Sequence, residues 1–186
     1  MGRKDLYKVI VFFILSGLVF IWISGNFDLW TLRRNLAPIR YQAEIDKYAD
    51  KFSLDRELLT ALIYVESRFD KYSRSSKGAV GLMQLMPPTA NWIAEELEYN
   101  NFNLDDLDNP ELNIEFGSWY LAYLYQKFDK NLIKTIAAYN AGENNVRSWI
   151  ETGWEGDLQQ KLPFAETDNF VRRVISTKNY YKQNDI

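Results

Sequence analysis

Apolar residues recur three and four positions apart along most of the chain after residue 38, and no segment alternates as a surface strand does. Prolines and helix-capping side chains, Asp55 and Asn109 among them, stand at the starts of these segments. The ranges that this spacing predicts as helices are 38–53, 55–69, 87–97, a long one from 110, 131–140, 143–151 and 166–182. The residues of the long helix expected to face inward are Leu112, Phe116, Trp119, Tyr120, Tyr123 and Leu124. The domain is therefore expected to be mainly α.

The first thirty residues differ from the rest of the chain. Residues 9–23 are apolar apart from Ser16 and Gly17, and basic residues precede them. At ~1.5 Å per helical residue this run covers roughly 22 Å, which is short for a bilayer span and also suits the core of a signal peptide. Because the small-residue cleavage pattern is poor and aromatic residues follow the run, we predict an uncleaved membrane anchor in residues 1–30, with a signal segment as the alternative. A single domain is expected over residues 31–186.

Composition narrows the chemistry available to that domain. The chain of 186 residues has no cysteine and no histidine, so disulfides, thiolate nucleophiles, Ser-His catalysis and histidine-bound metals are excluded. The formal net charge is −3 and no basic block occurs, which disfavours nucleic-acid binding. Carboxylates, tyrosines, lysines and hydroxyls remain, and no metal or cofactor is implied.

One carboxylate lies where an apolar side chain is expected. In a helix over 55–69, Glu66 shares a face with leucine, isoleucine and phenylalanine residues. Loss of hydration there would disfavour the charged form and raise the pKa, as a general acid at neutral pH requires. The alternative is a glutamate at the edge of the apolar stripe that reaches solvent.

The segment after this helix combines glycines with a polar amide among apolar side chains. Gly78 and Gly81 allow the backbone to approach a ligand closely, and Gln84 stands between Met83 and Leu85. Such an amide needs partners, either hydrogen bonds in the core or sugar hydroxyls and acetamides. The glycine spacing fits neither a P-loop nor G-x-G-x-x-G, so phosphate binding is not indicated.

Several short motifs occur in the order and spacing of a known family. They are Glu66-Ser67, Ser75, Gly78-Ala79-Val80-Gly81-Leu82-Met83-Gln84-Leu85-Met86-Pro87 with Thr89-Ala90, Ala138-Tyr139-Asn140-Ala141-Gly142, and Pro163 with Glu166-Thr167. Over roughly residues 40 to 182 the chain resembles the soluble-lytic-transglycosylase catalytic domain. The resemblance implies a lysozyme-like helical domain with a glycan cleft, acting on peptidoglycan glycan strands.

The resemblance also implies a mechanism in which one glutamate acts twice. Glu66 would protonate the oxygen that links N-acetylmuramic acid to N-acetylglucosamine, while the muramic acid's acetamide stabilises the anomeric centre. The ionised Glu66 would then take the proton from the C6 hydroxyl, whose attack closes a 1,6-anhydro ring. This use of one group as acid and then base is a substrate-assisted exception to the two-carboxylate rule.

Further positions carry over from the family one at a time. The residues expected to contact the glycan or to hold the loop beside the acid are Ser67, Ser75, Gln84, Tyr139, Asn140 and Glu166. The chain departs from the family pattern at Asp168, where an arginine is common, and at Phe170, where a tyrosine is common. These departures put contacts near Glu166 in doubt but not the chemistry of Glu66.

Two other functions are compatible with the sequence. A hydrolytic muramidase on the same fold would need a second acid facing Glu66, for instance Asp105, Asp106 or Asp108. A non-catalytic, membrane-tethered module would keep the cleft only for binding the wall. A membrane anchor before a cleft for wall glycan implies a domain on the extracytoplasmic side of the membrane, working close to it. Protein partners are not indicated.

Overall fold

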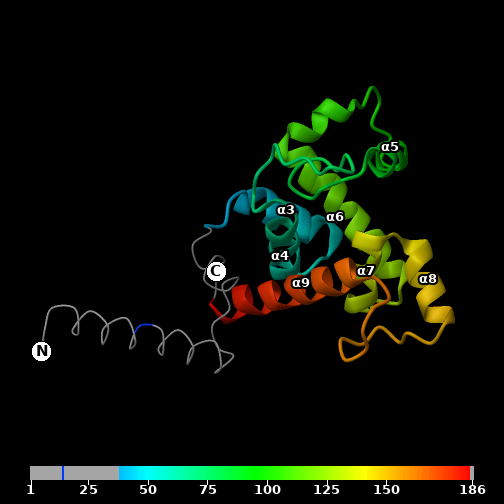
Figure 1. Cartoon of the computed structure of the whole chain (residues 1–186). Coiled ribbons are helices and arrows are strands. Elements are labelled where there is room, and N and C mark those ends of the chain that lie inside the picture. The colour runs from blue at the N-terminus through cyan, green and yellow to red at the C-terminus, as the bar shows by residue number, and fades with distance from the viewer. Residues whose placement is uncertain (1–13, 15–37, 185–186) are drawn as a thin grey trace, which may run out of the picture. The chain divides into compact units, whose positions relative to one another are not determined.

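The computed structural model describes residues 14 and 38–184 (Figure 1). The chain divides into two units, Met1–Pro38 and Ile39–Ile186. The elements of the second unit are α3 (Gln42–Phe52), α4 (Arg56–Ser67), α5 (Pro87–Glu96), the 3-10 helix η1 (Leu104–Asp108), α6 (Pro110–Lys127), α7 (Leu132–Ala141), α8 (Glu143–Glu151) and α9 (Ala165–Gln183). Within the described residues there is no strand, only isolated bridges at Val80. The predicted mainly α architecture is confirmed.

Side-chain caps start the helices where the sequence places them. The Asp55 carboxylate accepts a hydrogen bond from the backbone N–H of Leu58 at 2.7 Å, and Asn109 caps α6 in the same way. The predicted start at Pro38 is wrong, because α3 begins at Gln42 after Tyr41, which has a positive φ of 62°. Helix η1 was not predicted; its first turn is closed by a capping box between Asn103 and Asp106.

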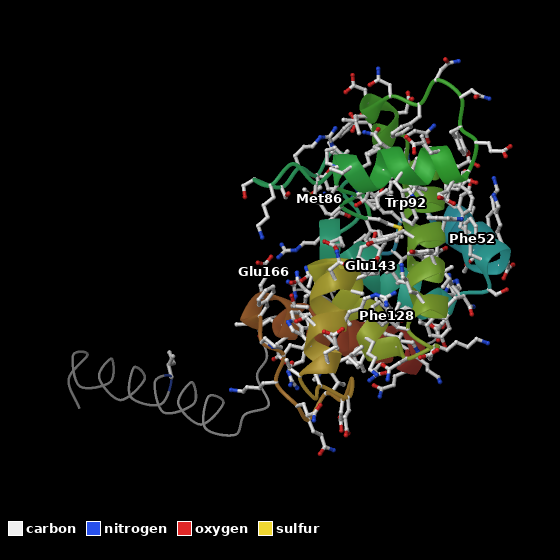
Figure 2. The ribbon with its side chains drawn as sticks, turned by 90° about the vertical axis from the view of Figure 1, so that its right-hand side faces the viewer. Phe52, Met86, Trp92, Phe128, Glu143 and Glu166 are labelled. Carbon is white, nitrogen blue, oxygen red and sulfur yellow. The ribbon has the colours of Figure 1, made fainter. Side chains whose placement is uncertain are left out.

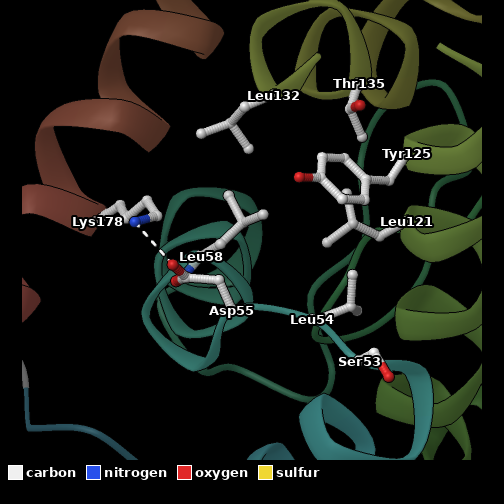
Figure 3. Close-up of a pocket in the computed structure, with 9 residues that line it drawn as sticks. All are labelled: Ser53, Leu54, Asp55, Leu58, Leu121, Tyr125, Leu132, Thr135 and Lys178. Carbon is white, nitrogen blue, oxygen red and sulfur yellow. Dashed lines mark hydrogen bonds and ion pairs between the residues drawn. The ribbon is translucent and has the colours of Figure 1, made fainter. Parts of the chain in front are cut away.

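Helix α4 occupies the centre of the second unit, with α3 and α9 packed against it (Figure 1). Its residues Leu59, Leu62 and Ile63 are fully buried, so most of its surface is covered by neighbours. The Lys178 ammonium on α9 pairs with the Asp55 carboxylate at 2.9 Å, beside a pocket of about 300 Å³ (Figure 3). This pocket lies at the start of α4, whereas Glu66 lies in its last turn.

The long helix α6 buries a different set of residues from the predicted one. Phe116 and Leu124 are fully buried as expected, but Trp119, Tyr120 and Tyr123 are only half-buried. Because α3, α5, α7 and η1 all contact α6, its buried positions do not form one stripe. The side chains of Trp119, Tyr120 and Tyr123 therefore lie at the edge of the core.

The predicted anchor in residues 1–30 lies outside the described residues. Among the residues that are described, no helix is both long enough and apolar enough to cross a membrane.

Candidate active site

Glu66 lies in the last turn of α4 and is half-buried. Burial raises the pKa of its carboxyl group from the ordinary value near 4.5 to about 8. The negative charge of Glu166 also raises this pKa, and the positive charge of Arg173 lowers it. Within the described part of the chain, no hydrogen bond contributes to the shift. The carboxyl group is therefore mostly protonated at neutral pH, which is the state that a general acid needs.

The backbone reverses direction directly after Glu66. Arg68 and Phe69 have positive φ angles of 54° and 64°, which ends the helix and leads into the segment 70–86. Ser67 is buried, and its hydroxyl donates to the Ile63 carbonyl of its own helix at 3.1 Å. The Ser67 hydroxyl therefore helps to hold the end of α4.

The following loop is held by hydrogen bonds from its own side chains. The hydroxyl of Ser75 accepts from the N–H of Ala79 at 2.9 Å. The side-chain amide of Gln84 donates to the carbonyls of Ser73 and Gly81 at 3.1 and 2.9 Å. Both predicted residues thus fix the loop, and Gln84, itself at a positive φ of 46°, is left half-exposed.

A buried asparagine of α6 anchors the same loop from below. The side-chain oxygen of Asn113 accepts from the N–H of Met83 at 2.8 Å, and its amide donates to the carbonyls of Val80 and Leu107 at 3.1 Å each. Asn113 is completely buried, so all three bonds form away from water. Asn113 was not predicted from the sequence, because a polar side chain in an amphipathic helix ordinarily faces solvent.

A pocket of about 250 Å³ brings three of the predicted residues together. Its lining residues are Gln84, Leu85, Met86, Thr89, Tyr120, Tyr139, Asn140, Ala141 and Gly142. The Tyr139 hydroxyl donates to the Met83 carbonyl at 2.8 Å, which ties α7 to the loop. The Asn140 side chain accepts from the Thr167 hydroxyl at 2.8 Å, which ties α7 to α9.

The charge of the Glu66 carboxyl group acts on Tyr139, one of the residues that line this pocket. The pKa of Tyr139 is raised well above its usual range, first by burial and then by the charges of Glu66 and Tyr120. The Tyr139 hydroxyl therefore stays protonated and remains a hydrogen-bond donor. Because their N–H and O–H donors are used within the protein, Gln84 and Tyr139 present oxygen acceptors to the pocket, whereas Asn140 presents its side-chain amide; such groups bind sugar hydroxyls and acetamides.

Glu166 lies in the first turn of α9 and is largely exposed (Figure 2). Its carboxylate meets the Lys77 ammonium at 3.3 Å, which joins α9 to the loop after α4.

The acids proposed from sequence as second carboxylates are engaged elsewhere: Asp108 pairs with Arg74, and Asp106 accepts from the Asn103 N–H. Neither they nor Asp105 are among the groups that shift the pKa of Glu66.

Arg173 is a charged neighbour of Glu66 that was not predicted from the sequence. It lies two turns after Glu166 on α9, and its guanidinium donates to the Val65 carbonyl at 3.4 Å. Burial and the nearby charge of Arg68 lower its pKa, while Glu66 raises it. No sequence signal could have found it, because 107 residues separate it from Glu66 and only the packing of α9 on α4 brings them together.

Comparison with known proteins identifies the domain. The family model for the transglycosylase SLT domain matches residues 43–160. The soluble lytic murein transglycosylase of Escherichia coli K12 is 32% identical over 166 residues, covering 86% of this chain and 25% of the relative. The membrane-bound lytic murein transglycosylase C of Edwardsiella ictaluri is 27% identical, covering 86% of this chain and 53% of the relative. An inactive mutant of lytic transglycosylase Slt from Pseudomonas aeruginosa matches with a TM-score of 0.74 and 31% identity, over 80% of this chain and 25% of that one.

The fold and the site together define a helical, lysozyme-like domain built around one half-buried acid. The family model covers well over half of the chain, and the chain belongs to the transglycosylase SLT domain family. It spans about a quarter of the length of the Escherichia and Pseudomonas relatives. The family and the lysozyme-like fold expected from the sequence motifs are both confirmed.

Proposed function

We propose that this protein is a peptidoglycan lytic transglycosylase that cleaves the bond between N-acetylmuramic acid and N-acetylglucosamine. The observation that carries the proposal is the half-buried Glu66, whose pKa of about 8 leaves it protonated at neutral pH. The pocket beside it offers the amide and hydroxyl groups of Gln84, Asn140 and Tyr139 to a sugar. The names of the relatives support the same activity.

In the proposed first step, Glu66 donates its proton to the glycosidic oxygen and the bond from this oxygen to the muramic anomeric carbon breaks. The muramic acetamide oxygen bonds to the anomeric carbon and carries the positive charge, so no second protein carboxylate is needed. In the second step the C6 hydroxyl oxygen of the same sugar bonds to that carbon, the bond from the acetamide oxygen to the carbon breaks and restores the neutral acetamide, and the hydroxyl proton returns to Glu66. The product ends in 1,6-anhydromuramic acid, and Glu66 is again protonated.

The electrostatic setting of Glu66 suits both steps. Burial favours the protonated form that the first step uses, whereas the positive charge of Arg173 favours the ionised form that the second step uses. A pKa near the working pH lets one group serve in turn as acid and base. Tyr139, Asn140 and Gln84 are proposed to bind the glycan at the pocket, Ser67 and Ser75 to support that site, and Glu166 to contact the glycan at its edge.

The proposed activity is tested by mass analysis of the products released from purified peptidoglycan by the full chain in detergent. Products ending in 1,6-anhydromuramic acid are expected from the wild type and should be lost in Glu66→Gln, which keeps the shape but cannot donate the proton. Glu151→Gln, at the exposed end of α8, is the matched control and should retain activity. Reducing-end products would instead mean a hydrolytic muramidase. Glycan binding without any product would mean a binding module.

We further propose that residues 1–30 anchor the domain in the membrane, with residues 31–186 on the side that faces the cell wall. The apolar run at 9–23 supports this, as does the membrane-bound relative. The test is alkaline extraction of membranes from expressing cells. The wild-type chain should stay in the membrane pellet, and a variant with Leu15→Arg and Val19→Arg should be released. Wild-type protein in the wash, or at a size shortened by the leader, would contradict the anchor.

A further inference from the structure

A second pocket, of about 320 Å³, adjoins the one proposed for glycan. Its lining residues are Thr89, Trp92, Tyr120, Tyr123 and Glu143. Thr89 and Tyr120 line both pockets, so a ligand held in the first can extend into the second. Trp92 comes from α5 and Glu143 from the first turn of α8 (Figure 2).

The aromatic rings of this second pocket form a corner. The Trp92 ring lies at 70° to the ring of Tyr123 and at 83° to that of Tyr120, with centroids 5.0 and 6.1 Å apart. The two tyrosine rings are close to parallel, at 14°. A sugar stacks on one flat ring face, whereas a small cation is attracted by several ring faces arranged around it. The corner therefore offers several aromatic rings of the kind that attract a compact cationic group.

A lysine of the protein, Lys127, already pairs with the carboxylate that lines this pocket. The Lys127 nitrogen lies 2.6 Å from the Glu143 carboxylate and 4.7 Å from the centre of the Tyr123 ring, and it also bonds the Tyr123 hydroxyl. Glu143 and Lys127 are about one third and one quarter exposed, so a ligand can reach them. A carboxylate and an aromatic face at these distances are the groups that recognise a primary amine. Glu143 uses one of its two oxygens for Lys127, and a carboxylate can accept further bonds.

We propose that this pocket binds a side-chain ammonium group of the wall peptide carried by the glycan, with Glu143 as its carboxylate partner and Trp92, Tyr120 and Tyr123 around it. The proposal rests on the proposed function, since it assumes a peptidoglycan strand in the neighbouring pocket. Lys127 competes with the ligand for the same carboxylate and so weakens the site. The pocket thus makes the enzyme prefer strands whose peptides keep a free amine.

The experiment compares two forms of one substrate. Peptidoglycan strands whose peptides carry a free side-chain amine are digested beside the same strands after acetylation of the amines, and kcat/KM is measured for each with the full chain. The wild type should prefer the free amine by about fivefold, the size of one partly exposed cation–aromatic and carboxylate contact. Thermal unfolding of each variant checks that it is folded.

Two substitutions should change this preference in opposite directions. Glu143→Gln removes the carboxylate and leaves Lys127 to repel the ligand, so the preference should disappear or reverse. Lys127→Met removes the competing ammonium and frees Glu143, so the preference should increase. A purely structural role for the ion pair would move both variants the same way, because each breaks the same contact.

The outcomes separate this inference from the proposed function. The acetylated strands have no free side-chain amine, so the formation of anhydro products from them tests the lytic activity independently of the proposed amine site. If those products form and the wild type shows no preference for the free amine, the pocket has been misassigned while the activity stands. Shifts of the same sign in Glu143→Gln and Lys127→Met would also overturn the proposal. Absence of anhydro products from both substrates would refute the proposed function itself.

Discussion

The hydroxyl of Tyr139 on α7 donates a hydrogen bond to the carbonyl of Met83 in the loop after α4, across 56 residues of sequence. The ring of Tyr139 also contacts that of Tyr120, at a centroid distance of 5.5 Å. One side chain thus links the loop, α6 and α7 around the pocket proposed for glycan. Substitution of Tyr139 should therefore affect both folding and activity.

Tyr139→Phe keeps the ring and removes only the hydroxyl. The Met83 carbonyl loses its partner, so the free energy of unfolding should fall by about 1 kcal/mol in urea titrations. The rate at which soluble products form from peptidoglycan should also fall, because the loop is held less firmly beside Glu66. Tyr125→Phe is the control: Tyr125 lines the pocket at the start of α4, so this change should leave activity as it was (Figure 3). Equal loss of activity in both variants would show that the Tyr139 hydroxyl has no particular role.

The raised pKa of Glu66 makes folding depend on pH. Between about pH 4.5 and 8 the folded protein holds a proton on Glu66 that the unfolded chain has released. Unfolding then releases a proton, and the free energy of unfolding falls as pH rises, by at most about 1.4 kcal/mol per unit. The total loss should be on the order of 4 kcal/mol and should be complete above the folded pKa.

Glu66→Gln abolishes this dependence, which allows it to be measured. The difference in unfolding free energy between wild type and Glu66→Gln cancels the other titrating groups. It should be constant below about pH 4.5, should move in favour of Glu66→Gln as pH rises, and should level off above about pH 8. A difference independent of pH would mean that Glu66 titrates normally and is not the buried acid described here.

The same pKa sets the alkaline limit of activity. Because protonated Glu66 is needed in the first step, kcat/KM should fall as pH rises through about 8. Glu166→Gln removes a negative charge that raises the pKa of Glu66. The alkaline fall of kcat/KM should therefore move to lower pH in this variant. If the alkaline fall of kcat/KM in Glu166→Gln stays at the same pH or moves to higher pH, the charge of Glu166 does not raise the pKa of Glu66.

The sequence predicts those parts of the fold that depend on near neighbours. Asp55 and Asn131 cap their helices through backbone groups three residues ahead, so local sequence contains both partners. The position of Glu66 within an apolar stripe follows from helical periodicity alone. The carboxyl's half-burial and raised pKa were predictable for the same reason.

Features that depend on the packing of distant segments were not predictable. Arg173 reaches Glu66 only because α9 lies along α4, and Asn113 reaches the loop only because α6 passes beneath it. The aromatic residues of α6 were predicted to be core, but contact with Trp92 of α5 leaves Tyr120 and Tyr123 half-exposed at a pocket. Local periodicity gives the face of a helix and not which neighbour covers it.

Two glycines of the loop share a positive φ angle but differ in the space around them, so alanine substitutions at the two positions separate the cost of backbone strain from the cost of a steric clash. Both have positive φ angles, 88° at Gly78 and 80° at Gly81, which an alanine adopts at a cost of about 1–2 kcal/mol. A Cβ at Gly78 would meet nothing within 4 Å. A Cβ at Gly81 would lie 2.1 Å from the Asn113 amide nitrogen and 2.9 Å from the Leu107 carbonyl, so the asparagine would have to move.

Gly81→Ala should therefore destabilise the protein more than Gly78→Ala, by about 2 kcal/mol or more, since it also disturbs the hydrogen bonds of Asn113. Urea unfolding of the two single variants measures this difference. Asn113→Ala alone should also be destabilising, because it leaves the Met83 N–H without its partner and takes a donor from the carbonyls of Val80 and Leu107. Combined with Gly81→Ala it should cost less than the sum of the two, because the clash with the Asn113 side chain disappears and only the close approach to the Leu107 carbonyl remains. Strict additivity, or equal losses for the two glycine variants, would show that Asn113 does not hold Gly81 in place.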